Sequence, residues 1–140
     1  MLRIILVILA VTTATAEAVE DGRTLVEMPP EVQATLRLEM MDHMAAINEL
    51  IGYLGSGDLK RVAEVAEKRM GVSSMGKHRQ TAMGPGRFMP PEMRAFGMAM
   101  HQSSSRLAEI AEQGDLQESV AALQEVTAAC VACHYTYRVR

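Results

Sequence analysis

Five consecutive residues near the C-terminus carry the clearest chemistry in this sequence: Cys130, Val131, Ala132, Cys133 and His134. Two thiols three positions apart on one helical turn can each add to a vinyl group of haem, while the adjacent imidazole binds the iron. This C-x-x-C-H arrangement is the attachment signature of c-type haem. The sequence therefore predicts one haem c, with thioethers to Cys130 and Cys133 and with His134 as the proximal iron ligand.

Other uses of a C-x-x-C pair fit the sequence less well. A redox-active dithiol of the thioredoxin type needs a βαβ context, which this sequence lacks. A zinc site needs more than the two cysteines that the chain contains. Neither alternative explains the histidine that follows, and a disulfide is not expected if both thiols form thioethers.

The N-terminal 18 residues have the layout of a secretory signal peptide. Arg3 precedes an apolar run at residues 4–11, and small residues then lead to an A-x-A cleavage pattern ending at Ala16 or Ala18. The run is shorter than the roughly 20 apolar residues of a membrane span, although an uncleaved anchor remains an alternative. We expect removal of the signal peptide and no membrane attachment afterwards.

The mature chain, residues 19–140, is expected to form one domain in the periplasm, because bacteria attach haem covalently outside the cytoplasm. The formal net charge of −3 gives no support for nucleic-acid binding. No nucleophile, base and orienting group can be identified together, so an enzyme is not expected.

Composition and periodicity favour an all-α fold. Ala, Leu, Met, Glu and Gln are frequent and Trp is absent, which favours helices over sheets. Apolar residues recur at steps of three and four in four segments, as amphipathic helices require. The expected helices cover residues 30–54, 58–70, 91–113 and 115–137, and residues 72–90 form a long loop rich in Gly, Pro and basic residues.

Each expected helix has an apolar side. In the first helix it comprises Leu36, Met40, Met44, Ile47, Leu50, Ile51 and Leu54. In the third it comprises Met93, Phe96, Met100, Leu107, Ile110 and Ala111. In the fourth it comprises Leu116, Val120, Leu123, Val126, Cys130, Cys133 and Tyr137. Two helical hairpins joined by a long loop predict an antiparallel four-helix bundle, with the haem thiols continuing the core side of its last helix.

With this helix order, the chain resembles the class II cytochromes c, the cytochrome c′ family. The similarity is most specific at residues 130–138, which match the family's C-x-x-C-H-x-x-Y-R ending. The resemblance implies a four-helix bundle around one haem, and it places Arg138 near the proximal imidazole or a haem propionate. The alternative for Arg138 is a solvated side chain near the helix end. The resemblance also implies redox partner proteins and a homodimer formed through the first two helices.

The sixth iron position decides the function, and the family places it against the first helix. The family pattern of an Arg four positions before the distal residue selects Met41 after Arg37. The apolar side of the helix instead selects Met40, our preferred ligand, with His43 as the alternative and Met44 in the same turn. His78 and His101 are weaker candidates, and all these residues could equally be ordinary core residues.

Two functions follow from the haem, and a third hypothesis does not involve it. Six-coordinate iron would serve electron transfer, whereas five-coordinate iron under an apolar residue would bind nitric oxide or carbon monoxide. The third is a soft copper(I) site formed by Met75, Met83, Met89, Met98 and Met100 beside His78 and His101. Because methionine is common in helices and cores, the sequence favours packing for these residues.

Overall fold

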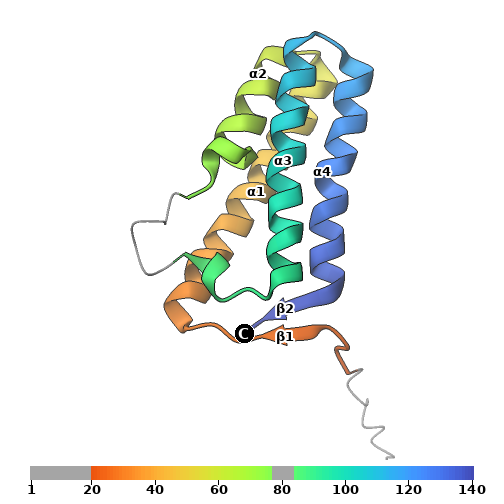
Figure 1. Cartoon of the computed structure of the whole chain (residues 1–140). Helices are drawn as coiled ribbons and strands as arrows, with labels where there is room; N and C mark the ends of the chain where they lie inside the picture. The colour runs from red at the N-terminus through yellow and green to blue at the C-terminus, as the bar shows by residue number, and fades with distance from the viewer. Residues whose placement is uncertain (1–19, 77–83) are drawn as a thin grey trace, which may run out of the picture.

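The computed structural model describes residues 20–76 and 84–140 of the chain. Four helices run alternately up and down: α1 (Pro30–Ser56), α2 (Leu59–Val65), α3 (Pro91–Glu112) and α4 (Leu116–Thr136) (Figure 1). A π-helical segment, η1 (Ala66–Met70), continues α2. The predicted all-α four-helix bundle is thereby confirmed. The predicted signal peptide, His78 and Met83 lie outside the described residues.

The helix ends follow from local sequence. Pro30 occupies the first turn of α1, where its missing N–H costs no hydrogen bond. Gly57 ends α1 with a φ of 74°, a left-handed conformation that glycine adopts without strain. The side chains of Asp58 and Asp115 accept hydrogen bonds from the backbone N–H groups of Arg61 and Glu118 and so cap α2 and α4.

The long connection after η1 contains two short 3₁₀ turns among its described residues. The first is η2 (Val72–Ser74) and the second is η3 (Pro85–Arg87). α2 and η1 end about halfway along the bundle, and η3 lies beside the half of α1 that they do not cover (Figure 1).

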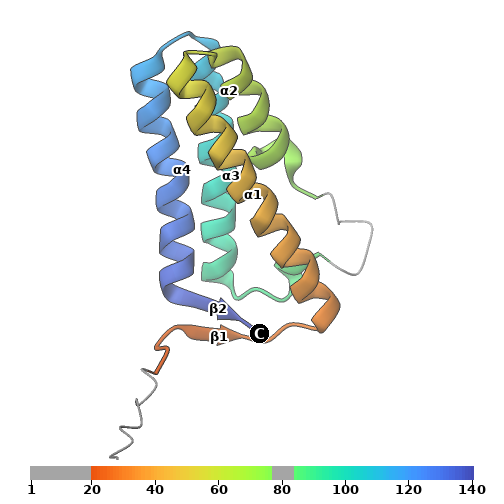
Figure 2. The same cartoon turned by 180° about the vertical axis from the view of Figure 1, so that it is seen from behind.

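Two short strands join the ends of the described chain, and the sequence did not predict them. β1 (Thr24–Val26) pairs in parallel with β2 (Tyr137–Val139), directly after α4. The segment before α1 is therefore fixed across the end of the bundle where α4 finishes (Figures 1 and 2).

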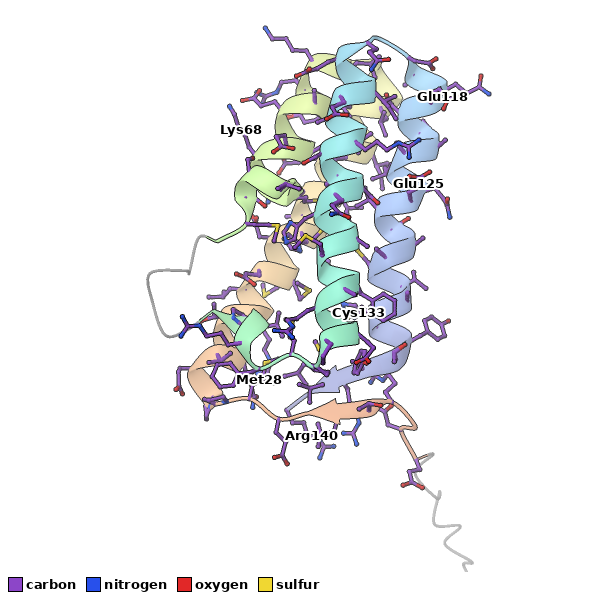
Figure 3. All side chains as sticks on the ribbon, in the orientation of Figure 1. Met28, Lys68, Glu118, Glu125, Cys133 and Arg140 are labelled. Atoms are coloured by element: carbon purple, nitrogen blue, oxygen red, sulfur yellow. The ribbon has the colours of Figure 1, made fainter. Side chains whose placement is uncertain are left out.

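The core consists of two apolar clusters. The main cluster fills the half of the bundle away from the strands and includes Leu50, Val62, Leu107 and Val126. The strand-end cluster is smaller and comprises Val26, Met28, Val32, Leu36 and Met93. Figure 3 shows Met28 and Cys133 at this same end of the molecule.

The expected apolar sides of α1 and α4 are partly wrong. Met44 and Ile51 of α1, and Leu116 and Val120 of α4, are exposed. Small residues are buried in their place, among them Ala46 in α1 and Ser119 and Ala122 in α4. Close approach of neighbouring helices requires these small side chains, so the buried stripe of each helix is rotated relative to the most hydrophobic one.

The helices diverge at the strand end. α3 packs along the length of α4, whereas α1 approaches α4 at the far end of the bundle and leans away from it toward the strands (Figure 2). In the described part of the chain, no helix is both long and apolar enough to span a bilayer.

Candidate haem site

The two cysteines lie on the last turns of α4 and form no disulfide. Cys130 packs against the main cluster and Cys133 against the strand-end cluster, so both thiols are half-buried. The Cys130 thiol donates a hydrogen bond to the carbonyl of Val126, with an Sγ–O distance of 3.4 Å. Burial raises the pKa of both thiols, and the neighbouring Cys130 raises that of Cys133 further.

His134 differs from the cysteines in being exposed. Its backbone carbonyl accepts a hydrogen bond from Nη1 of Arg23 at 3.3 Å, which ties the end of α4 to the segment before β1. Because this contact uses the backbone, the imidazole ring itself is left to other partners.

Arg138 lies on β2 and is bound to the same N-terminal segment. Its Nε lies 3.4 Å from the Arg23 carbonyl, to which it donates, and 3.6 Å from a carboxylate oxygen of Asp21. Asp21 also pairs with the Arg23 side chain at 2.7 Å, and this hydrogen bond holds the pKa of Asp21 well below its usual range. The predicted contact of Arg138 with a propionate or the proximal imidazole stays a prediction.

The four candidates for the sixth iron ligand on α1 have different surroundings. Met40 is half-buried and packs, like Cys133, against the strand-end cluster. His43, three positions after Met40 and therefore on the same face of the helix, is half-buried and lines a cavity, as Met40 also does. Met41 and Met44 are 66% and 72% exposed. Of the four, Met40 is the one that shares a cluster with a cysteine of the predicted attachment motif.

A cavity of about 880 Å³ lies between α1, α3 and the described ends of the long connection. Leu36, Met40 and Met89 belong both to its wall and to the surroundings of the strand-end cluster. Cys130, Cys133 and His134 do not line it. The cavity therefore adjoins the attachment turn across the strand-end cluster without including it.

The cavity also brings His101 to His43, a pairing that the sequence did not predict. The two rings meet edge to face, with ring centres 6.0 Å apart. Nδ1 of His101 lies 2.6 Å from the carbonyl oxygen of Met70. Each histidine lies beside the apolar side of its helix. Together with the packing of α1 against α3, these positions would have predicted that the two rings meet.

The residues present fit the predicted haem. Two thiols at the required spacing remain unpaired, and an imidazole follows on the same helix. Apolar side chains border the attachment turn, and α1 leaves α4 at this end (Figure 2). A soft thioether and an imidazole on α1 are suitable second ligands for iron.

Comparison with known families agrees with this geometry. The family model described as Cytochrome C' matches residues 32–138. The chain belongs to the cytochrome c′ family. It is therefore a haem-binding cytochrome, built as the four-helix bundle described above. Neither the curated proteins nor the solved structures gave a significant match.

Membership of the cytochrome c′ family bears on the haem site in one further way. The matched residues 32–138 extend from the first turn of α1 to Arg138 and so include all of the predicted ligands. Membership of the family does not by itself distinguish a cytochrome with six-coordinate iron from one with five-coordinate iron.

Proposed function

We propose that this cytochrome is an exported electron carrier with one haem c. In this proposal Cys130, Cys133 and His134 bind the haem, and Met40 is the second protein ligand of the iron. The observation that supports it is the contact of Cys133 and Met40 with one apolar cluster. In this proposal the protein exchanges electrons with other redox proteins and has no enzymatic activity of its own.

Bound haem supplies a one-electron iron couple. The chain holds this couple at a fixed place through two thioethers on α4. Val32, Leu36 and Met93 keep water from the side of the attachment turn that faces α1. The half-buried position and the thioether of Met40 would favour the reduced state, because a buried site disfavours the extra positive charge of the ferric state.

The same cluster gives the alternative function its support. If Met40 does not reach the iron, the buried side chains of Val32 and Leu36 present an apolar surface. A five-coordinate iron beside such a surface would bind nitric oxide or carbon monoxide. The two functions therefore differ in the ligation of the iron.

The absorption spectrum of the purified ferric protein tests the proposal. We expect a six-coordinate low-spin spectrum, which Met40→Leu converts to a high-spin one; leucine keeps the side-chain volume but offers no lone pair. A five-coordinate high-spin spectrum of the unmodified protein would exclude electron transfer by this route and favour gas binding.

Replacement of His43 provides the matched control. If His43→Ala, and not Met40→Leu, gives the high-spin spectrum, the iron has two histidine ligands. A low-spin spectrum unchanged in both variants would transfer the assignment to Met41 or Met44.

Export and attachment can be measured together. Expression with the bacterial export and haem-attachment systems should yield a mature chain beginning near residue 19, with an intact mass increased by one haem. A chain that keeps its N-terminal 18 residues would contradict cleavage of the predicted signal peptide.

Self-association belongs to the proposal as well. α1 exposes a set of large apolar side chains: Leu38, Met41, Met44 and Ile51. Together with the family's tendency to pair through its first two helices, this exposed set favours a homodimer that uses α1.

A further inference from the structure

Sulfur atoms and imidazole rings form part of the wall of the cavity between α1 and α3. Five methionines line it together with the two histidines: Met40, Met75, Met89, Met98 and Met100. We propose that this cavity binds a copper(I) ion through His43, His101, Met75 and Met98. Neither cysteine nor His134 lines the cavity, so the proposed copper ligands are distinct from the attachment motif, while the wall of the cavity includes Met40, the proposed iron ligand.

The separation of the two rings suits a shared ion. A nitrogen ligand lies about 2 Å from its metal and roughly 1 Å from the centre of its own ring, so two imidazoles on one ion have ring centres roughly 5 to 6 Å apart. The ring centres of His43 and His101 are 6.0 Å apart. The perpendicular arrangement of the rings does not oppose binding, because the terminal torsion of histidine is broad.

The hydrogen bond of His101 sets its tautomer. A carbonyl oxygen accepts but cannot donate, so Nδ1 of His101 must donate its proton to the Met70 carbonyl, 2.6 Å away. In the neutral ring the lone pair is then on Nε2. Metal-binding histidines commonly have this arrangement, in which a backbone carbonyl orients the ring and raises the basicity of the ligating nitrogen.

The thioethers can be assigned by their other contacts. The sulfur of Met100 accepts a hydrogen bond from Ser104 and lies in the main cluster. Met40 and Met89 pack against the strand-end cluster. Met98 remains, three positions before His101 on the same face of α3, and Met75 lines the cavity just after η2.

The donor set selects the metal. Thioethers prefer copper(I), whereas Zn²⁺ is bound by thiolates, imidazoles and carboxylates. Within the described residues, no three His, Cys, Asp or Glu side chains are grouped as a metal site. Three arginines line the cavity, Arg69, Arg87 and Arg94, together with the acidic residues Glu39 and Asp42. The guanidinium of Arg69 pairs with Asp42 and Glu49 at 2.5 Å each, which offsets its repulsion of a cation.

The test uses the exported, haem-loaded protein and copper(I) under anaerobic, reducing conditions, in competition with a chromogenic copper(I) chelator. We expect one equivalent of copper to be withheld from the chelator. His101→Ala and Met98→Leu should each weaken binding at least tenfold. Met44→Leu, which removes an exposed methionine outside the cavity, should leave the affinity unchanged.

Four results would overturn the site. They are no copper withheld by the unmodified protein, equal binding by His101→Ala, equal or tighter binding of Zn²⁺ in a parallel titration, and a haem spectrum altered by His101→Ala. The last result would make the histidine a partner of the iron. If His101→Ala fails to fold, the combined Met75→Leu and Met98→Leu variant conserves volume and decides the same question.

Discussion

Cys130 and Cys133 lie on one helix but contact different parts of the core. Cys130 packs against the main cluster, and Cys133 packs against the strand-end cluster next to Met40. Thioethers at both positions would therefore fix the haem across the boundary between the two clusters. The burial that raises the pKa of both thiols also lowers the fraction of reactive thiolate.

Single serine replacements test these separate roles. Cys130→Ser and Cys133→Ser should each retain haem through one thioether, and the reduced pyridine haemochrome band should shift to longer wavelength because one vinyl group stays conjugated. Cys133→Ser should also change the ferric absorption spectrum more than Cys130→Ser, since Cys133 shares its cluster with Met40. Loss of all covalent haem from the double replacement, measured by intact mass, is the control. Haem retained covalently by that double variant would contradict attachment at these residues.

At the scale of the elements, one glycine within α1 and one directly after it illustrate how position determines the effect of a substitution on stability. Gly57 has a φ of 74°, so an added Cβ is strained there even though no atom lies within 4 Å of it. Gly52 lies inside α1, is exposed, and likewise has open space where a Cβ would be added. The same substitution should therefore have opposite consequences at the two positions.

Gly57→Ala should lower the free energy of unfolding by about 1 kcal/mol, because alanine is forced into the left-handed region at the turn between α1 and α2. Gly52→Ala should raise it by about 0.5–1 kcal/mol through helix propensity. Urea unfolding followed by circular dichroism measures both values. Equal effects of the two substitutions would show that the turn conformation is not what matters.

The sequence predicted the helices well because their signals are local. Asp58, Asp115 and Gly57 act within one turn of their positions, and apolar residues recur at helical steps. The two strands were missed because each has three residues, and their pairing joins segments at opposite ends of the described chain. No local pattern specifies such a contact.

The candidate site likewise has features that the local sequence predicts and features that depend on long-range packing. The spacing of Cys130, Cys133 and His134 can be read from the sequence because haem chemistry requires it. Met40 is preferred as the iron ligand already from the sequence and stays a prediction, whereas the rotation of α1 about its axis, which buries Ala46 and leaves Met44 exposed, is seen in the structure alone. The pairing of His43 with His101 required the packing of α1 beside α3, which no sequence period encodes.

At the scale of the whole molecule, the two ends of the bundle serve different purposes. The main cluster closes one half, where all four helices pack together. At the other half α1 leaves α4, and the strands and the end of α4 that carries the predicted attachment motif lie there (Figures 1 and 2). The cavity borders this half through Leu36, Met40 and Met89. The main cluster and the predicted haem site therefore lie in different halves of the bundle, and the exposed apolar side chains of α1 extend over both halves.

Ile51→Glu tests whether that face forms the homodimer. Ile51 is 58% exposed and is none of the candidate iron or copper ligands, so its replacement should leave both metal sites intact. A buried carboxylate without a partner would be costly in an apolar interface, so we expect the haem-loaded variant to be monomeric at concentrations where the unmodified protein is dimeric. Sedimentation velocity over a range of concentrations measures this. Val120→Glu places the same charge at a 52% exposed position on α4 and should leave the dimer unchanged. Equal dissociation of both variants, or a monomeric unmodified protein, would exclude α1 as the interface.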